Sequence, residues 1–107
     1  MITGNMKPVA KTGTFTLNIA TMLFDIANLR VTPNDFKSQE NHPDYIIECR
    51  TPRGNYLRVG SMWKAVGANS GNAYYSISVT DRNGKTWRMN AVRNDTTPTG
   101  EWVIVPL

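Results

Sequence analysis

Short runs in which apolar and polar residues alternate, separated by turn residues, constrain the fold of this chain more than any other feature. Alternation with a period of two is typical of a strand with one buried and one solvent-facing side. Clusters of glycine, proline and asparagine divide the runs, which are residues 14–19, 45–50, 56–64, 73–80, 85–92 and 101–105. Turns about every 8–12 residues are typical of small antiparallel barrels and sandwiches. We therefore predict an all-β fold, a small antiparallel barrel or sandwich of six to seven short strands.

Residues 22–31 are compatible with two elements. Met22, Leu23, Ile26 and Leu29 could line one face of a short helix. The same segment also reads as a strand with a bulge, the interpretation that we favour. Pro33 ends either element, because proline lacks the backbone N–H that continues it.

The start of the chain lacks a periodic pattern. Residues 1–12 are polar and contain Gly4 and Pro8. We therefore expect residues 1–12 to form a flexible leader and residues 13–107 to form a single β domain.

A hairpin signal lies at Asp81-Arg82-Asn83-Gly84, between two alternating runs. A two-residue turn would pair Val79 with Arg88. A three-residue turn with Gly84 in the left-handed conformation pairs Val79 with Trp87 instead, which matches apolar to apolar. Asp81 suits the start of such a turn. We predict the three-residue turn.

That register assigns the side chains to two faces. Tyr75, Ile77 and Val79 face the core, and Trp63 is expected either in the core or at its rim. The opposite, solvent-facing side of the neighbouring strands then carries two tyrosines, two arginines and three smaller residues that can form hydrogen bonds. Its predicted members are Tyr56, Arg58, Tyr74, Ser76, Ser78, Arg88 and Asn90.

Positive charge is concentrated in one part of the chain. The whole chain has a net charge of +4, yet residues 50–93 hold eight basic residues against the single acid Asp81. Six of the eight are arginines, whose planar guanidinium suits phosphates, carboxylates and aromatic faces. The asymmetry points to a polyanion or an acidic protein surface as partner; the alternative is an ordinary solvated face.

No catalytic motif is complete. One cysteine and one histidine leave little for metal or nucleophilic chemistry, and Gly84-Lys85-Thr86 lacks the first glycine of a phosphate-binding loop because Val79 stands there. We expect no enzyme, no cofactor and no metal. The start of the chain has no signal-like apolar stretch, so we expect a cytoplasmic protein.

The order of several short motifs resembles a bacterial family catalogued as domain of unknown function seven-three-six, whose members occur on plasmids and integrative elements. The motifs are Gly13-Thr14-Phe15, Pro43-Asp44-Tyr45, Val59-Gly60, Trp63-Lys64, Gly71, Tyr74-Tyr75-Ser76-Ile77-Ser78-Val79 and Asp81. The chain departs from the family in the turn after its first strand and in the leader before Gly13. The resemblance implies a small, all-β, non-catalytic accessory protein of a mobile element or phage.

Two functions follow as hypotheses. In the first, the chain binds nucleic acid, preferably single-stranded, through the basic sheet face. In the second, it is an inhibitor of a host defence system, an anti-CRISPR or anti-restriction protein that occludes a protein partner through the same face. A homodimer is a third use of that face. The residues expected to bind are Arg50, Arg53, Tyr56, Arg58, Lys64, Tyr74, Arg82, Lys85, Arg88 and Arg93.

Overall fold

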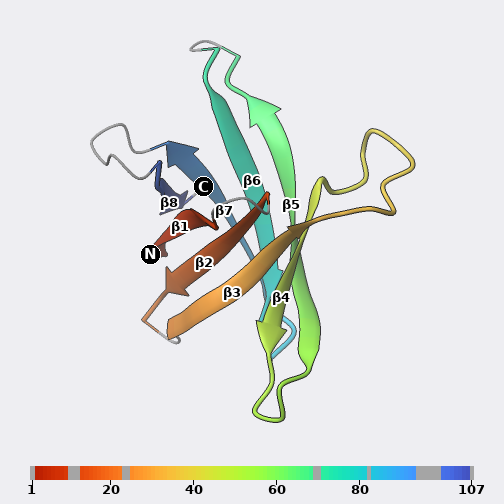
Figure 1. The fold of residues 1–107 in the computed structure, drawn as a ribbon. Coiled ribbons are helices and arrows are strands. Elements are labelled where there is room, and N and C mark those ends of the chain that lie inside the picture. The colour runs from red at the N-terminus through yellow and green to blue at the C-terminus, as the bar shows by residue number, and fades with distance from the viewer. Residues whose placement is uncertain are drawn as a thin grey trace.

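The chain forms a closed antiparallel β-barrel of eight strands (Figure 1). The computed structural model describes residues 2–9, 13–22, 25–68, 71–81, 83–93 and 100–106. The strands are β1 Thr3–Val9, β2 Thr14–Ala20, β3 Asp25–Pro33, β4 Tyr45–Arg50, β5 Tyr56–Val66, β6 Ala73–Thr80, β7 Thr86–Arg93 and β8 Trp102–Pro106. Each strand pairs with its neighbour in the chain, and β1 pairs with β8 to close the barrel. The prediction of an all-β fold is confirmed, while the predicted six to seven strands are too few.

The additional strand is β1, which lies in the segment expected to be a flexible leader. That expectation is wrong for residues 3–9, whereas residues 10–12 lie outside the described ranges. β1 pairs with β2 along its whole length and with β8 through Gly4, Asn5 and Met6. Met6 is fully buried, and a Cβ at Gly4 would collide with the carbonyl oxygen of Asn18. A polar strand is stable here because a closed barrel supplies hydrogen-bond partners on both of its edges.

The segment at residues 22–31 contains a strand in its described part. β3 begins at Asp25 and ends at Pro33, and its pairing with β2 shifts register between Leu17 and Ile19. Asn28 opposes that shift with a φ of 62°, and its backbone N–H donates to the Asn18 side chain at 2.8 Å. The alternative of a short helix is therefore wrong, and the strand with a bulge is confirmed.

The hairpin between β6 and β7 has the predicted register. Val79 pairs with Trp87, and Gly84 has a φ of 83°. The Asp81 carboxylate accepts hydrogen bonds from the backbone N–H groups of Asn83 and Lys85 and, at 2.9 Å, from the Trp87 indole. The indole bond is the main cause that holds the pKa of Asp81 below its ordinary 3.8. The turn therefore uses one carboxylate to fix both its own backbone and the first inward ring of β7.

The barrel interior is filled by aliphatic and methionine side chains. One inward row consists of Met62, Ile77 and Met89, which are paired across β5, β6 and β7 and are almost fully buried. Gly60 lies in the next row between Ile47 and Val79, where a Cβ would collide with the carbonyl oxygen of Ser78. Close packing of this kind fixes which side of each strand faces water.

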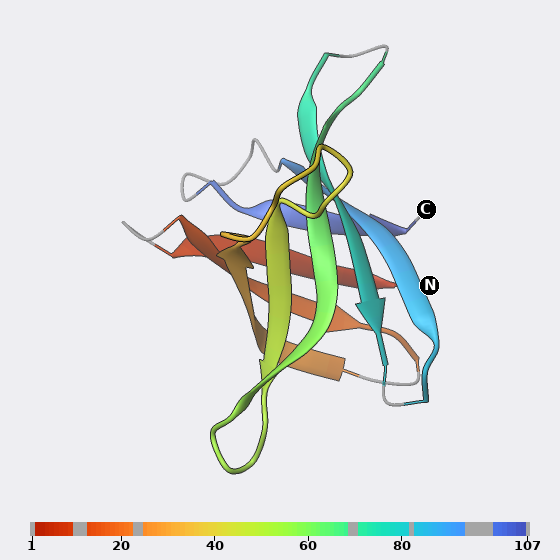
Figure 2. The same cartoon turned by 90° about the vertical axis from the view of Figure 1, so that its right-hand side faces the viewer.

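Two hairpins extend beyond the barrel at opposite ends (Figure 2). The β5–β6 hairpin extends at the end where β4 begins, and the β4–β5 hairpin extends at the other end. Leu57, on the β4–β5 hairpin, is 57% exposed although it pairs with Cys49 on the inward-facing side, because the hairpin there has left the core. No helix within the described ranges has the length and apolar character that crossing a membrane requires.

Candidate nucleic-acid interface

The solvent-facing surface of β5, β6 and β7, which we call the outer face, is turned toward the viewer in Figure 2. Strand pairing arranges its side chains in three rows, because directly paired residues lie on the same side of a sheet. The rows are Ser61–Ser78–Arg88, Trp63–Ser76–Asn90 and Ala65–Tyr74–Val92, and Arg58 lies on the same side of β5. The predicted outward positions of Arg58, Tyr74, Ser76, Ser78, Arg88 and Asn90 agree with this register.

Two arginines lie at one end of the outer face, Arg88 in the first row and Arg58 next to it on β5. The Arg58 guanidinium donates to the Ser61 hydroxyl at 2.9 Å, which brings its charge beside Ser78 and toward Arg88. Both arginines are exposed. No acidic residue stands on β5, β6 or β7, all of whose residues the structure describes. The two guanidiniums therefore face water without a carboxylate on their own strands.

Trp63 lies on the outer face, which corrects the expectation of a core or rim position. Its cross-strand neighbour is Ser76, and its indole N–H donates to the Asn41 carbonyl at 3.1 Å. The β3–β4 loop that carries Asn41 is anchored by Asp44, which accepts from Lys37 Nζ and from the Lys64 backbone N–H at 2.8 Å. These two bonds, the Lys37 bond first, lower the pKa of Asp44. Sequence reasoning could have found the orientation, because Met62 is inward and the next residue must point out.

Tyr56 faces outward, as predicted, on the same side of β5 as Arg58, but it does not lie beside Tyr74. It pairs with Arg50 near the base of the β4–β5 hairpin, at the other end of β5 from Tyr74. The Arg30 guanidinium lies 3.4 Å from the centre of the Tyr56 ring and also binds Glu48 at 2.9 Å. One side of that ring is therefore already covered. Arg50 points to the same side as Tyr56, and Arg53 is exposed in the turn beyond them.

Three more predicted binding residues lie off the outer face. Lys64 pairs with Tyr75 and Arg93 pairs with Trp102, so both belong to the inward-facing side at one end of the barrel. Lys85 lies 4.1 Å from the centre of the Trp87 ring, beside the β6–β7 turn. Arg82 lies outside the described residues. Alternation alone could not separate these positions, because the inward side of a strand becomes exposed once the strand passes the barrel end.

The same barrel end is filled by four aromatic rings, Phe15, Tyr45, Tyr75 and Trp102, which we call the aromatic mouth. Phe15, Tyr45 and Tyr75 contact one another and Trp102 contacts Tyr75, with centroids 4.8–5.7 Å apart in the edge-to-face arrangement that aromatic pairs prefer. Burial, followed by the neighbouring Tyr45, raises the pKa of Tyr75 to about 12. The Lys64 ammonium is 5.8 Å from the centre of the Tyr45 ring. The mouth is therefore a packed cluster with cations at its edge.

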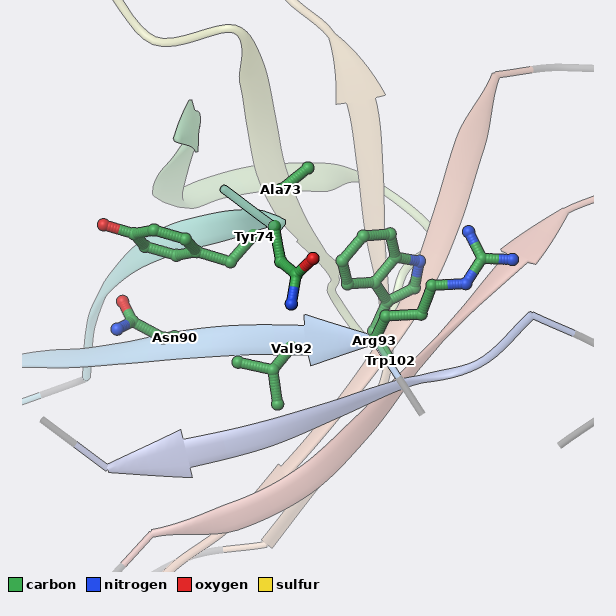
Figure 3. Close-up of a pocket in the computed structure, with 7 residues that line it drawn as sticks. Ala73, Tyr74, Asn90, Val92, Arg93 and Trp102 are labelled. Atoms are coloured by element: carbon green, nitrogen blue, oxygen red, sulfur yellow. The ribbon is translucent and has the colours of Figure 1, made fainter. Parts of the chain in front are cut away.

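A shallow groove of about 500 Å³ joins the outer face to the aromatic mouth (Figure 3). Its lining residues are Asn72, Ala73, Tyr74, Asn90, Val92, Arg93 and Trp102. The Tyr74 ring and the Asn90 amide extend the same way from β6 and β7, whereas Arg93 and Trp102 lie together on the other side. The groove thus offers aromatic, amide and guanidinium groups within one depression.

The site is chemically suited to binding. Within the described ranges, no three His, Cys, Asp or Glu side chains gather as metal ligands. Arginine, tryptophan, tyrosine, serine and asparagine provide charge, stacking surface and hydrogen bonds.

A family model described as "Protein of unknown function (DUF736)" matches residues 3–105. No curated protein and no solved structure shows a significant match to the chain. The matched residues include all eight strands except the last residue of β8.

Proposed function

Because this chain belongs to the DUF736 family of proteins of unknown function, we propose its role from its own surface: it acts by binding single-stranded nucleic acid along the outer face. The observation that carries the proposal is the combination of Arg58 and Arg88 with the rings of Trp63 and Tyr74 on one side of three strands that hold no acid.

The arginines supply the affinity for the backbone. Each exposed guanidinium can donate two parallel hydrogen bonds to a phosphate, and neutralising phosphates releases bound counterions. Ser61 and Ser78 lie between Arg58 and Arg88 and add hydroxyl donors in the same row. Glu48 of β4 is the cross-strand neighbour of Arg58, but its carboxylate is bound to Arg30 at 2.9 Å. The phosphate-binding row is therefore positive on balance.

The rings select single strands over duplex. Base stacking on an aromatic side chain requires a base that is free of its own neighbours, and it stabilises binding without demanding a sequence. Trp63 is held in place by its bond to Asn41, and Tyr74 lies one row further along β6. From Arg58 to Ala65 the strand spans about 20–25 Å. That length suits a site of about four nucleotides, the low end for a single β-barrel domain.

Binding of labelled oligonucleotides at several salt concentrations tests the proposal. Oligo(dT) should bind at low salt, with an affinity that falls on a log–log plot by about 0.7 for each phosphate contacted. Arg88→Glu should weaken binding by about tenfold and reduce the salt slope by about 0.7, the contribution of one phosphate contact. The Arg58→Glu, Arg88→Glu double variant should abolish it.

Lys7→Glu is the matched control. It changes the net charge by the same amount as Arg88→Glu, but Lys7 lies on β1, outside the outer face, and pairs with Glu101 at 3.1 Å. It should reduce affinity far less than Arg88→Glu. Equal losses from both variants would show that net charge alone attracts the oligonucleotide, and absence of binding at low salt would refute the proposal.

If no oligonucleotide binds, two other functions can be tested. Capture of a protein of a host defence complex, which the Arg58→Glu, Arg88→Glu double variant releases, would favour the occlusion alternative. A concentration-dependent mass in sedimentation would favour a homodimer.

A further inference from the structure

The groove beside Tyr74 exists because the neighbouring strands β6 and β7 diverge at the barrel end. The last pair between β6 and β7 is Tyr74 with Val92, and Ala73 instead pairs with Val66 of β5. β7 turns toward β8, where Arg93 pairs with Trp102. The β5–β6 hairpin therefore leaves the barrel while β7 stays in it, and the space between them is open to water.

The walls of this groove have the surfaces that a flat heterocycle needs. Tyr74 is half-buried, and its cross-strand neighbour Val92 is 37% exposed. Trp102 and Arg93 bound the far side, as Figure 3 shows. A depression of about 500 Å³ lies within the range of pockets that bind small molecules.

Asn90 supplies one of the polar groups of the groove, which Asn72 and Arg93 also line. It stands diagonally from Tyr74 across the β6–β7 pair, and such neighbours are about 7–8 Å apart, with their Cβ atoms somewhat closer. Its amide is half-buried and makes no side-chain hydrogen bond to any residue that the structure describes. An amide offers one donor and one acceptor side by side, the pattern that matches the N6 and N7 edge of adenine.

The geometry points to a subsite for one unstacked nucleobase in this groove, with adenine preferred: the base stacks on Tyr74, Asn90 reads its edge, and Arg93 at the far side meets the adjoining phosphate. This inference rests on the proposed binding of single strands along the outer face. It adds a base preference to a surface whose arginines are indifferent to sequence.

Equilibrium binding of three oligonucleotides at one fixed salt concentration tests the subsite. The three are oligo(dT), oligo(dT) with one central dA, and oligo(dT) with one central abasic position. The wild type should bind the dA oligonucleotide about tenfold more tightly than the abasic one, and more tightly than oligo(dT). Asn90→Ala should remove the preference for dA while leaving the affinity for oligo(dT) and the salt slope unchanged.

Ser76→Ala is the matched control, because Ser76 is the direct cross-strand neighbour of Asn90 and its loss should leave the preference intact. Tyr74→Phe keeps the ring and should keep the preference, whereas Tyr74→Ala should lose it. Oligonucleotide binding without any preference for dA, or a preference that survives Asn90→Ala, overturns the subsite but not the proposed function. Absence of all oligonucleotide binding overturns both.

Discussion

The outer face and the aromatic mouth are built from the same residue types and use them in opposite ways. In the mouth, the rings of Phe15, Tyr45, Tyr75 and Trp102 pack edge to face and contact one another. On the outer face, Trp63 and Tyr74 stand in separate rows, with serine, asparagine and arginine around them. Rings in the first arrangement stabilise the fold, and rings in the second leave stacking surface for a ligand.

The difference is sharpest between two consecutive residues. Tyr74 pairs with Val92 on the outside, and Tyr75 pairs with Ala91 on the inside. The alternation of a strand is enough to give adjacent tyrosines these two environments. Position along the strand, and not residue type, therefore decides whether an aromatic residue packs in the interior or faces water.

Replacing each of these two tyrosines by alanine should change the free energy of unfolding by very different amounts, and Tyr75→Ala should have the larger effect. Tyr75→Ala removes a ring that contacts Phe15, Tyr45 and Trp102, and should lower the free energy of unfolding by about 3 kcal/mol. Tyr74→Ala removes a half-buried ring of the outer face and should cost about 1 kcal/mol or less. Urea unfolding followed by fluorescence measures both.

Oligonucleotide affinity should move in the reverse order for the same two positions. Tyr74→Ala should weaken binding several-fold, whereas Tyr75→Phe, which keeps the packed ring, should bind as the wild type does. Equal losses of stability from Tyr74→Ala and Tyr75→Ala would contradict the division between the two regions.

The sequence predicts which side of a strand a residue faces wherever the strand lies within the barrel. The turn at Asp81 and Gly84 sets the pairing of Val79 with Trp87, and from it the outward positions of Arg88 and Asn90 follow. Tertiary closure is harder to predict. β1 contributes Met6 as its one fully buried side chain within Thr3–Val9, and a polar segment of that kind becomes a strand only because β2 and β8 flank it.

The ends of the barrel are the second limit of sequence reasoning. Lys64 and Arg93 have the alternation of core residues, yet they are exposed because their strands have reached or passed the mouth. Tyr56 has the alternation of the outer face, yet Arg30 of β3 covers it at the opposite end. Charge and period give no information on how far along the axis a residue lies, so the predicted site combined residues from three places.

Alkaline pH should distinguish Tyr75 from Tyr74 through a smaller change in stability. The folded state raises the pKa of Tyr75 from 10.0 to about 12, chiefly because burial disfavours the phenolate. A raised pKa means that the folded state holds the proton more tightly than the unfolded state, so this contribution is fully present below pH 10 and is lost as the pH rises from 10 to about 12. Tyr75→Phe has no proton to lose, and its stability should fall less over this window than that of the wild type.

Urea midpoints measured at several values across that window provide the check. Tyr74→Phe, which removes a hydroxyl from the outer face, is the matched control and should follow the wild type. A Tyr75→Phe variant that loses as much stability as the wild type between pH 10 and 12 would place the alkaline sensitivity elsewhere.

Acid pH tests the contacts of Asp44, in the loop that lies against both the aromatic mouth and the outer face. Its expected effect on stability is small. Asp44 accepts from Lys37 and from the Lys64 backbone beside the mouth, while Asn41 of the same loop holds Trp63 on the outer face. Those bonds lower the folded pKa of Asp44 below 3.8, so the stability they supply is present above pH 3.8 and is lost as the pH falls through the lowered value.

Asp44→Asn keeps an acceptor for the backbone but loses the ion pair, which should cost no more than about 1 kcal/mol near neutral pH because the pair is partly exposed. Its stability should then fall less than that of the wild type on acidification below pH 3.8. The part of the tryptophan fluorescence that Trp63→Phe removes should report whether the loop stays in place. Parallel acid losses in the two proteins would show that Asp44 does not connect the loop, the mouth and the outer face.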